Sequence, residues 1–142
     1  IYYNRVSIIL MFILEEFKKE LQEDTRIDEM NLLDKQMMLP AIKHKWVARL
    51  IEEKRGLNSL NRKKKEIREK VFAALKEGGI PTGIPKSNLD KKIDSSEAIL
   101  KIDQEIEDKE IVIEYLEKVE SIFKSMTFDM KNIVEITKME TT

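Results

Sequence analysis

Residues 61–70 carry the most basic stretch of the chain. Their sequence is NRKKKEIREK, in which six side chains are basic and two are acidic. Lysine and arginine at this density can follow the phosphates of a nucleic acid, whatever its base sequence. This stretch is therefore the first candidate for a DNA-binding surface. Its basic residues are Arg62, Lys63, Lys64, Lys65, Arg68 and Lys70.

A solvated helix surface is the second interpretation of the same stretch. Charge runs are common on exposed helices, where i,i+4 pairs such as Glu66 with Lys70 add a little stability. On a helix the basic positions spread around more than half of the circumference, so packing cannot bury all of them. From these residues alone, both interpretations stay open.

Aromatic side chains near the basic stretch are few. Base stacking on aromatic rings strengthens binding to single strands, and the nearest rings are those of Trp46 and Phe72. We include Trp46 and the adjacent Lys45 among the candidate DNA-binding residues. However, the spacing of Trp46 from Leu50 also explains it as a core residue of a helix.

The charge is unevenly distributed along a chain whose formal net charge is only −1. Residues 15–34 hold eight acids and three bases, a net charge of −5. Residues 43–70 hold eleven bases and four acids, a net charge of +7. Residues 94–142 hold thirteen acids and six bases, a net charge of −7. One segment thus concentrates the positive charge, which favours an anionic partner.

The residue types required for common enzyme sites are missing from the sequence. There is no cysteine and only one histidine, His44, which excludes cysteine nucleophiles, Cys-ligated zinc and paired-histidine metal sites. No glycine-rich phosphate loop, HExxH motif or EF-hand ligand spacing is present. The acids spaced three and four apart over residues 103–117 are typical of a solvated helix face. We therefore predict a protein that is not an enzyme and has no cofactor.

Length and composition favour one modest helical domain. The chain has 142 residues, of which 42% are hydrophobic and only 6% aromatic, with four glycines and three prolines. Long polar-faced helices fit this composition better than a turn-rich sheet, so we predict an all-α fold.

Hydrophobic periodicity locates the helices of the first half. A short helix is expected around residues 12–21, and Asp28 is the expected N-cap of a second one. Pro40 then either starts a new helix or kinks a continuing one. A long basic helix is expected over about residues 41–77, where Gly78-Gly79 is a stop signal.

The second half is predicted to contain a linker and further helices. The linker covers about residues 78–93, because it is rich in proline and glycine. The helices that drive oligomerisation follow over about residues 94–140, with Asp94 or Ser95 as the first cap. A last short helix is expected over residues 127–139, with inward-facing Phe128, Ile133 and Ile136.

The two long helices are expected to form an antiparallel hairpin with shorter flanking helices. A hairpin buries only part of each apolar seam, so we predict that the protein assembles into a helical oligomer. The predicted oligomerisation residues lie on the second long helix at helical spacings. They are Ile99, Ile102, Ile106, Ile113, Leu116 and Phe123.

The N-terminal stretch requires a separate interpretation. The apolar run from Ile8 to Leu14 is shorter than the roughly 20 residues of a membrane span. The first methionine is Met11. We therefore expect residues 1–10 to be a non-native or disordered extension and residues 11–142 to form the single helical domain.

From Leu14 onward, several short helical patterns follow one another in a characteristic order. They are LEEFKKEL, the ID at 27–28 leading to LPAIKHKW, IREKV at 67–71, ILKID at 99–103 and FDMKNIVEI at 128–136. In their order and spacing, rather than in one specific motif, they resemble the UvsY-like recombination mediators of T-even-type bacteriophages and their marine relatives.

The resemblance implies a non-enzymatic mediator in the cytoplasm of the infected bacterial host. Members of the family bind single-stranded DNA, help displace the phage single-strand-binding protein and load the phage RecA-like recombinase in recombination, repair and replication. The resemblance also implies a homo-oligomer, a hexamer or heptamer, assembled mainly through the C-terminal helix. No membrane partner is expected.

The resemblance further assigns a basic pair to DNA contact, here Arg68 and Lys70. Relatives often follow this pair with two tyrosines and a glycine, whereas this chain continues with Phe72-Ala73-Ala74. We therefore expect less base stacking than in those relatives. The alternative function is a non-enzymatic coiled-coil structural or adaptor protein that binds another helix and no nucleic acid.

Overall fold

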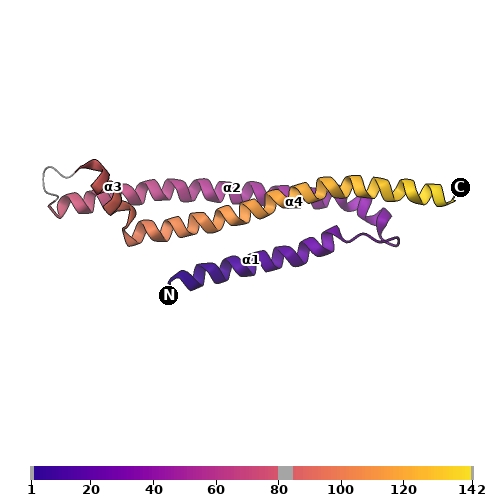
Figure 1. Ribbon diagram of the computed structural model, residues 1–142, viewed down its shortest axis with the longest axis horizontal. Helices are drawn as coiled ribbons and strands as arrows, with labels where there is room; N and C mark the ends of the chain where they lie inside the picture. The colour runs from indigo at the N-terminus through magenta and orange to yellow at the C-terminus, as the bar shows by residue number, and fades with distance from the viewer. Residues whose placement is uncertain (1, 80–84, 142) are drawn as a thin grey trace. The chain divides into compact units, whose positions relative to one another are not determined.

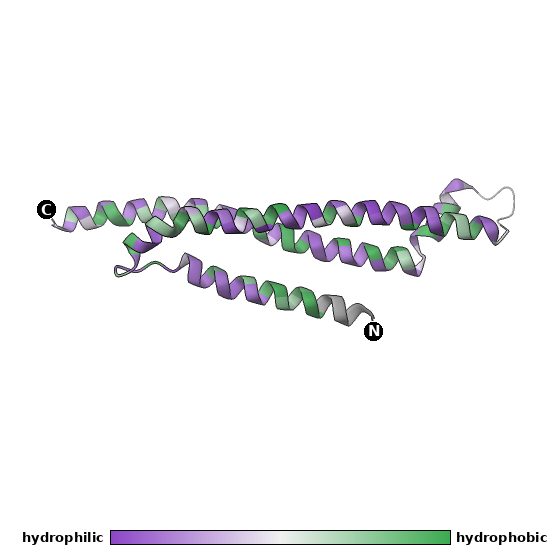
Figure 2. Ribbon diagram, turned by 180° about the vertical axis from the view of Figure 1, so that it is seen from behind, coloured by the Kyte–Doolittle hydropathy of each residue, from purple (hydrophilic) through white to green (hydrophobic). Residues whose placement is uncertain are grey.

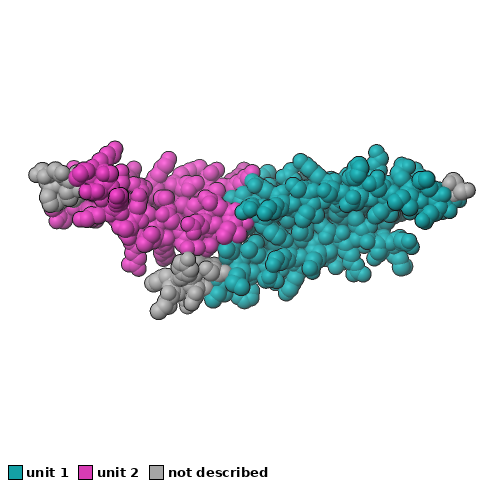
Figure 3. All heavy atoms as spheres, viewed as in Figure 1, with its two compact units in different colours: residues 1–53, 112–142 teal, residues 54–111 magenta. Residues whose placement is uncertain are grey.

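Four α-helices account for nearly all of the structure, a computed structural model that describes residues 2–79 and 85–141, with side chains from residue 8 onward. They are α1 (Tyr2–Thr25), α2 (Leu32–Glu77), α3 (Lys86–Asp94) and α4 (Glu97–Thr141) (Figure 1). The described segments contain no strand, which confirms the predicted all-α class. The helices form two compact units, residues 1–53 with 112–142 and residues 54–111 (Figure 3).

Unit 1 contains three helical segments, which are α1, the first half of α2 and the second half of α4. Unit 2 contains the second half of α2, α3 and the first half of α4. In unit 2 the two long helices run antiparallel, as the predicted hairpin requires, and α3 lies at the end that connects them (Figure 1). No helix among the described residues is long and apolar enough to cross a membrane.

Local sequence explains where α2 begins and ends. Asp28 Oδ1 accepts hydrogen bonds from the backbone N–H groups of Met30 and Asn31, each at 2.9 Å. This capping turn precedes the first helical residue, Leu32. At the other end Gly79 has a φ of +79°, a left-handed conformation that favours glycine and ends the helix. The capping role expected for Asp28 and the predicted glycine stop both fit this geometry.

Helix α2 continues through Pro40. Proline lacks the N–H of one helical hydrogen bond, so an uninterrupted helix here needs support from packing. Leu39 and Ile42 supply that support, because both are buried on the core side of unit 1. Of the two predicted possibilities, continuation is the one observed.

The segment expected to be a linker contains helix α3. Its sequence KSNLDKKID has only two apolar residues, Leu89 and Ile93, but they are four apart and both belong to the hydrophobic core of unit 2. This weak helical pattern follows directly after two prolines, which favoured the prediction of a linker. The prediction of a linker over residues 78–93 is therefore corrected for residues 86–93, and its residues 80–84 lie outside the described structure.

Helix α4 begins at Glu97, slightly later than predicted. The hydroxyl of Ser95 donates to the carbonyl of Lys92, and that of Ser96 donates to the carbonyl of Ile93. Both serines therefore complete the end of α3, and Asp94 is the last residue of that helix. The expected side-chain cap by Asp94 or Ser95 is not formed, because these residues belong to a helix that the sequence analysis missed.

A single helix replaces the predicted break near Thr127, since α4 continues to Thr141. Thr127 Oγ1 donates to the carbonyl of Phe123 at 3.0 Å, which satisfies its hydroxyl within the helix. Met130 is the buried residue that follows, whereas Phe128 and Ile136 are 65% and 56% exposed. The expected inward orientation of Phe128, Ile133 and Ile136 is therefore wrong, because an unbroken helix keeps the face of Phe123 inward.

The predicted oligomerisation seam is the core of the protein itself. In unit 2, Ile99, Ile102 and Ile106 are buried and pack with partly buried residues of α2 such as Leu60 and Ile67. In unit 1, the other three seam residues are also at most 8% exposed. All six side chains are therefore buried by contacts within the chain. Their assignment to contacts with other subunits is corrected.

The N-terminal residues belong to the first helix. Residues 2–10 form the first turns of α1, which begins at Tyr2. Ile1 lies outside the described residues. That residues 1–10 are a non-native or disordered extension stays a prediction.

The contrast between two neighbours on α4 tests the position of the core. Ile99 is fully buried, whereas Leu100 is 57% exposed. We expect Ile99→Ala to lower the free energy of unfolding by about 2–5 kcal/mol, because it leaves a cavity in a packed core. The matched control Leu100→Ala is expected to change it by no more than about 0.5 kcal/mol. Urea unfolding followed by circular dichroism measures both, and equal losses would contradict the assignment.

Candidate nucleic-acid interface

Four cations of the basic stretch are exposed on α2, namely Arg62, Lys63, Lys65 and Lys70. The helical period places Arg62 and Lys65 opposite the partly buried Leu60, Ile67 and Val71, and it places Lys63 and Lys70 on one flank of that packed face. None of them forms an ion pair with any residue in the described part of the chain. Figure 2 shows hydrophilic residues over much of this half of α2. These side chains form what we call the outer cations.

The other two basic residues of the stretch turn toward neighbouring helices. Lys64 Nζ lies 2.6 Å from Asp103 Oδ1 of α4. The Arg68 guanidinium pairs with the carboxylate of Asp94 and lies 3.7 Å from Asp90, and both aspartates belong to α3. Lys64 and Arg68 each keep only a third of the side-chain surface exposed. They are therefore held by acids of unit 2 itself.

Two acids lie among the outer cations and reduce the positive electrostatic potential of this surface. Glu66 and Glu69 are both exposed on the same half of α2. Helix α3 adds exposed cations that the sequence analysis missed, namely Lys86, Lys91 and Lys92. Three of the nine residues in KSNLDKKID are lysines, but a linker, unlike a helix, is not expected to present a charged face.

Phe72 is the aromatic residue nearest the outer cations in sequence. It is 41% exposed, two residues after Lys70 on the same helix. A half-exposed ring in such a position offers a surface on which a base can stack. Phe72 is thus accessible to a nucleic acid.

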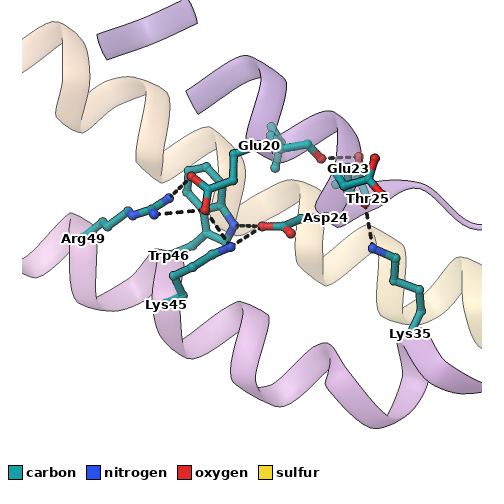
Figure 4. Close-up of polar contacts among 9 residues, drawn as sticks. Glu20, Glu23, Asp24, Thr25, Lys35, Lys45, Trp46 and Arg49 are labelled. Carbon is teal, nitrogen blue, oxygen red and sulfur yellow. Dashed lines mark hydrogen bonds and ion pairs between the residues drawn. The ribbon is translucent and has the colours of Figure 1, made fainter. Parts of the chain in front are cut away.

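Lys45 and Trp46 belong to a different cluster, in unit 1. Helix α1 presents two carboxylates, Glu20 and Asp24, to three side chains of α2 (Figure 4). Lys45 Nζ lies 2.9 Å from Glu20 Oε1 and 2.6 Å from Asp24 Oδ2. Arg49 donates to both oxygens of Glu20, at 2.6 and 3.0 Å. This cluster joins α1 to α2.

Trp46 lies at the centre of that cluster and is only 3% exposed. Its indole N–H donates to Asp24 Oδ2 at 2.8 Å, and its ring makes an edge contact with Phe17. The Arg49 guanidinium lies 4.8 Å from the indole centroid, in cation–π contact. A DNA base has no access to this ring, so the assignment of Trp46 to a stacking surface is corrected to a core role.

The ionic contacts shift the pKa values of the cluster. Hydrogen bonds from Arg49 lower the pKa of Glu20 from 4.5 to about 2, against the opposing effect of burial and with further help from Lys45. Burial would lower the pKa of Lys45, but its hydrogen bonds to Asp24 and Glu20 outweigh burial and raise it. Lys45 is therefore a paired cation that holds α1, rather than a free one.

Metal-ligating side chains do not converge within residues 2–79 and 85–141. No group of three or more histidine, cysteine, aspartate or glutamate residues in these ranges is placed to hold a metal ion. His44, the single histidine, is exposed on α2. The charged surface of unit 2 is thus the candidate interface that the described residues offer.

The profile of one protein family, described as "Recombination, repair and ssDNA binding protein UvsY", matches residues 20–142. The chain belongs to the UvsY family. The matched range contains the whole basic stretch, α3 and α4. The family predicted from short helical patterns is thereby confirmed.

Solved structures show the same fold. One crystal structure of the bacteriophage T4 recombination mediator protein UvsY matches with a TM-score of 0.78 at 18% identity, covering 89% of this chain and 98% of that chain. A second crystal form of the T4 protein matches with a TM-score of 0.76 at 21% identity, covering 91% and 98%. Among curated proteins, no sequence matches this chain.

The basic pair that the resemblance assigned to DNA contact has two different environments in this UvsY-family chain. Lys70 is exposed and belongs to the outer cations, whereas Arg68 is held by two aspartates of α3. Sequence spacing alone makes the two residues look equivalent. Only the positions of the acids on α3 distinguish them.

The cluster in unit 1 predicts a specific pH dependence. Because the folded state lowers the pKa of Glu20 to about 2, its stabilising effect is complete above about pH 4.5 and is lost as the pH falls toward 2. We expect the difference in unfolding free energy between wild type and Glu20→Gln to be largest at pH 5–7, to narrow below about pH 4.5 and to disappear near pH 2.

Urea unfolding at a series of pH values measures this difference. Glu16→Gln is the control, because Glu16 is an exposed residue of the same helix, and its ion-pair partner Lys19 is exposed and 4.0 Å away. This variant should retain the wild-type pH dependence. A constant difference between wild type and Glu20→Gln at all pH values would contradict the role of the Glu20 ion pairs.

Proposed function

We propose that this protein is a recombination mediator that binds single-stranded DNA through the outer cations of α2. One observation carries the proposal: a UvsY-family chain presents Arg62, Lys63, Lys65 and Lys70 on the exposed face of one helix, without ion pairs in the described structure. Side chains in this state are free to contact phosphates. The charge run is then more than a solvated surface.

The binding chemistry in this proposal is electrostatic and independent of base sequence. Each contact between a cation and a phosphate releases a counterion from the strand, so affinity falls as salt rises. Phe72 adds one accessible ring beside the cations, and Trp46 adds none, because it is buried. Stacking therefore contributes less than phosphate contacts.

A mediator role implies two protein partners in addition to DNA. We propose that the protein helps displace the phage single-strand-binding protein and loads a RecA-like recombinase in the cytoplasm of the infected host. The acidic surface of α4, with residues such as Glu107, Glu110 and Glu117, repels DNA and is suited to basic surfaces of those partners. Support for these steps comes from family membership.

Self-association completes the proposal, and its surface differs from the seam expected at first. Phe128, Ile136 and Met139 are 56–77% exposed. The helical period places Phe128 and Met139 opposite the buried Met126 and Met130, with Ile136 on the flank of that exposed face. We propose that other copies of the chain cover this face in a ring of six or seven subunits. Such a ring repeats the outer cations, so contacts that are weak singly act together.

The alternative function is a structural adaptor that binds another helix through the same apolar face and binds no nucleic acid. The exposed end of α4 favours it as much as it favours self-association. Fluorescence anisotropy with a labelled oligo-dT at low and high salt separates the two functions. Absence of salt-dependent binding would favour the adaptor.

Two outer cations provide a matched test of DNA binding. Lys63 and Lys70 are seven residues apart on the exposed face of α2, and Lys124 and Lys131 have the same spacing and are exposed on α4. We expect Lys63→Ala/Lys70→Ala to weaken oligo-dT binding about tenfold at low salt and to reduce the slope of log K against log salt by roughly 1.4. The control Lys124→Ala/Lys131→Ala should change both quantities much less. Equal effects would show a response to net charge alone.

A charged substitution tests the surface proposed for self-association. We expect Phe128→Asp to lower the mass measured by sedimentation equilibrium, because a carboxylate on this face cannot be buried without a partner. Ser59→Asp adds the same charge at an exposed position of α2 and should leave the mass unchanged. Helicity by circular dichroism should be the same in both variants. An unchanged mass for Phe128→Asp would exclude this face.

A further inference from the structure

Helix α3 carries two acidic residues and three exposed lysines. Its acids, Asp90 and Asp94, are the residues that pair with Arg68 of the basic stretch. Its exposed lysines make no ion pair with the described residues. The acids are therefore directed at one particular cation of α2, and the helix is not simply a neutral connector.

Hydrophobic contacts hold α3 in this position independently of the acids. Ile93 is 4% exposed and belongs to the same buried cluster as Ile99 and Ile102, and Leu89 packs against it. On a helix, Asp90 and Asp94 directly follow these two anchors, so docking of the apolar face brings both carboxylates beside Arg68. The position of the acids is thus a consequence of packing.

The ion pairs themselves lie in partial contact with water. The side chain of Arg68 is 33% exposed, that of Asp90 is 47% exposed and that of Asp94 is 56% exposed. Ion pairs at this exposure contribute little to stability. A guanidinium binds a phosphate in the same two-pronged geometry as a carboxylate, so a phosphate can replace the aspartates at small cost.

We propose that Asp90 and Asp94 form an acidic strap that competes with the DNA backbone for Arg68. The inference rests on the proposed function and names the regulation of that same site. In the free protein the strap neutralises Arg68, and the outer cations of α2 make the first contact with the strand. A bound strand then takes Arg68 from the strap, which adds a phosphate contact.

The strap has a consequence for binding. Because the carboxylates must be displaced, the protein holds single strands more weakly than its count of basic residues implies. A mediator has to release its strand to the next protein, and an internal competitor favours that release. Lys64 and Asp103 form a similar pair, but there the acid lies on α4 and not on α3.

The test compares two double variants that raise the net charge by the same amount. Asp90→Asn/Asp94→Asn removes the strap. Glu107→Gln/Glu110→Gln removes two exposed acids of unit 2 that pair with no described residue. Anisotropy with labelled oligo-dT over a range of salt concentrations gives the affinity and the salt slope of each. Circular dichroism checks helicity, and the single variant Asp90→Asn replaces the double variant if the latter is less helical.

We expect the strap variant to bind about threefold more tightly than the control variant at low salt, because no carboxylate has to be displaced from Arg68. The salt slopes of the two variants should be similar, since Arg68 contacts a phosphate in both complexes. Introducing Arg68→Ala into both variants should abolish this difference, since the freed cation is then missing. Equal affinities of the strap and control variants would overturn the strap while leaving DNA binding established. A wild type and variants that all fail to bind oligo-dT would overturn the proposed function itself, and the strap with it.

Discussion

Burial of one apolar face of α4 is the constraint on which the rest of the structure depends. In unit 2 this face contributes Ile99, Ile102 and Ile106, and in unit 1 it contributes residues such as Leu116 and Phe123. Each unit places α2 against it. Since α2 has only one side that can pack there, the rest of its surface faces solvent, and that surface carries the outer cations.

Polar contacts then decide which of the remaining cations are free. In unit 1, α1 brings Glu20 and Asp24 to Lys45, Arg49 and the indole of Trp46, so positive charge is used to hold a helix. In unit 2, acids of α3 and α4 hold Arg68 and Lys64. The two units show one principle: a basic helix in an acidic chain is partly neutralised by its own neighbours.

Much of the fold was predictable, because it depends on local signals. Strong apolar periodicity located the long helices, Asp28 marked the start of α2, and Gly79 marked its end. The failures have physical causes. Helix α3 depends on only two apolar residues, which a local pattern cannot distinguish from a linker, and Thr127 was taken for a break although its hydroxyl bonds within the helix. An apolar seam also does not reveal whether its partner is the same chain or another one.

The sequence by itself determined the helical class, the family and the segment that carries the positive charge, because composition and short-range periodicity are properties of the chain alone. Tertiary structure decided which charges are available. Lys70 and Arg68 are two residues apart, yet one faces water and the other meets Asp90 and Asp94. Trp46 is likewise a core residue because α1 packs over its ring. Both outcomes depend on contacts between segments that are distant in sequence, and side-chain burial and ion pairing are set by such contacts.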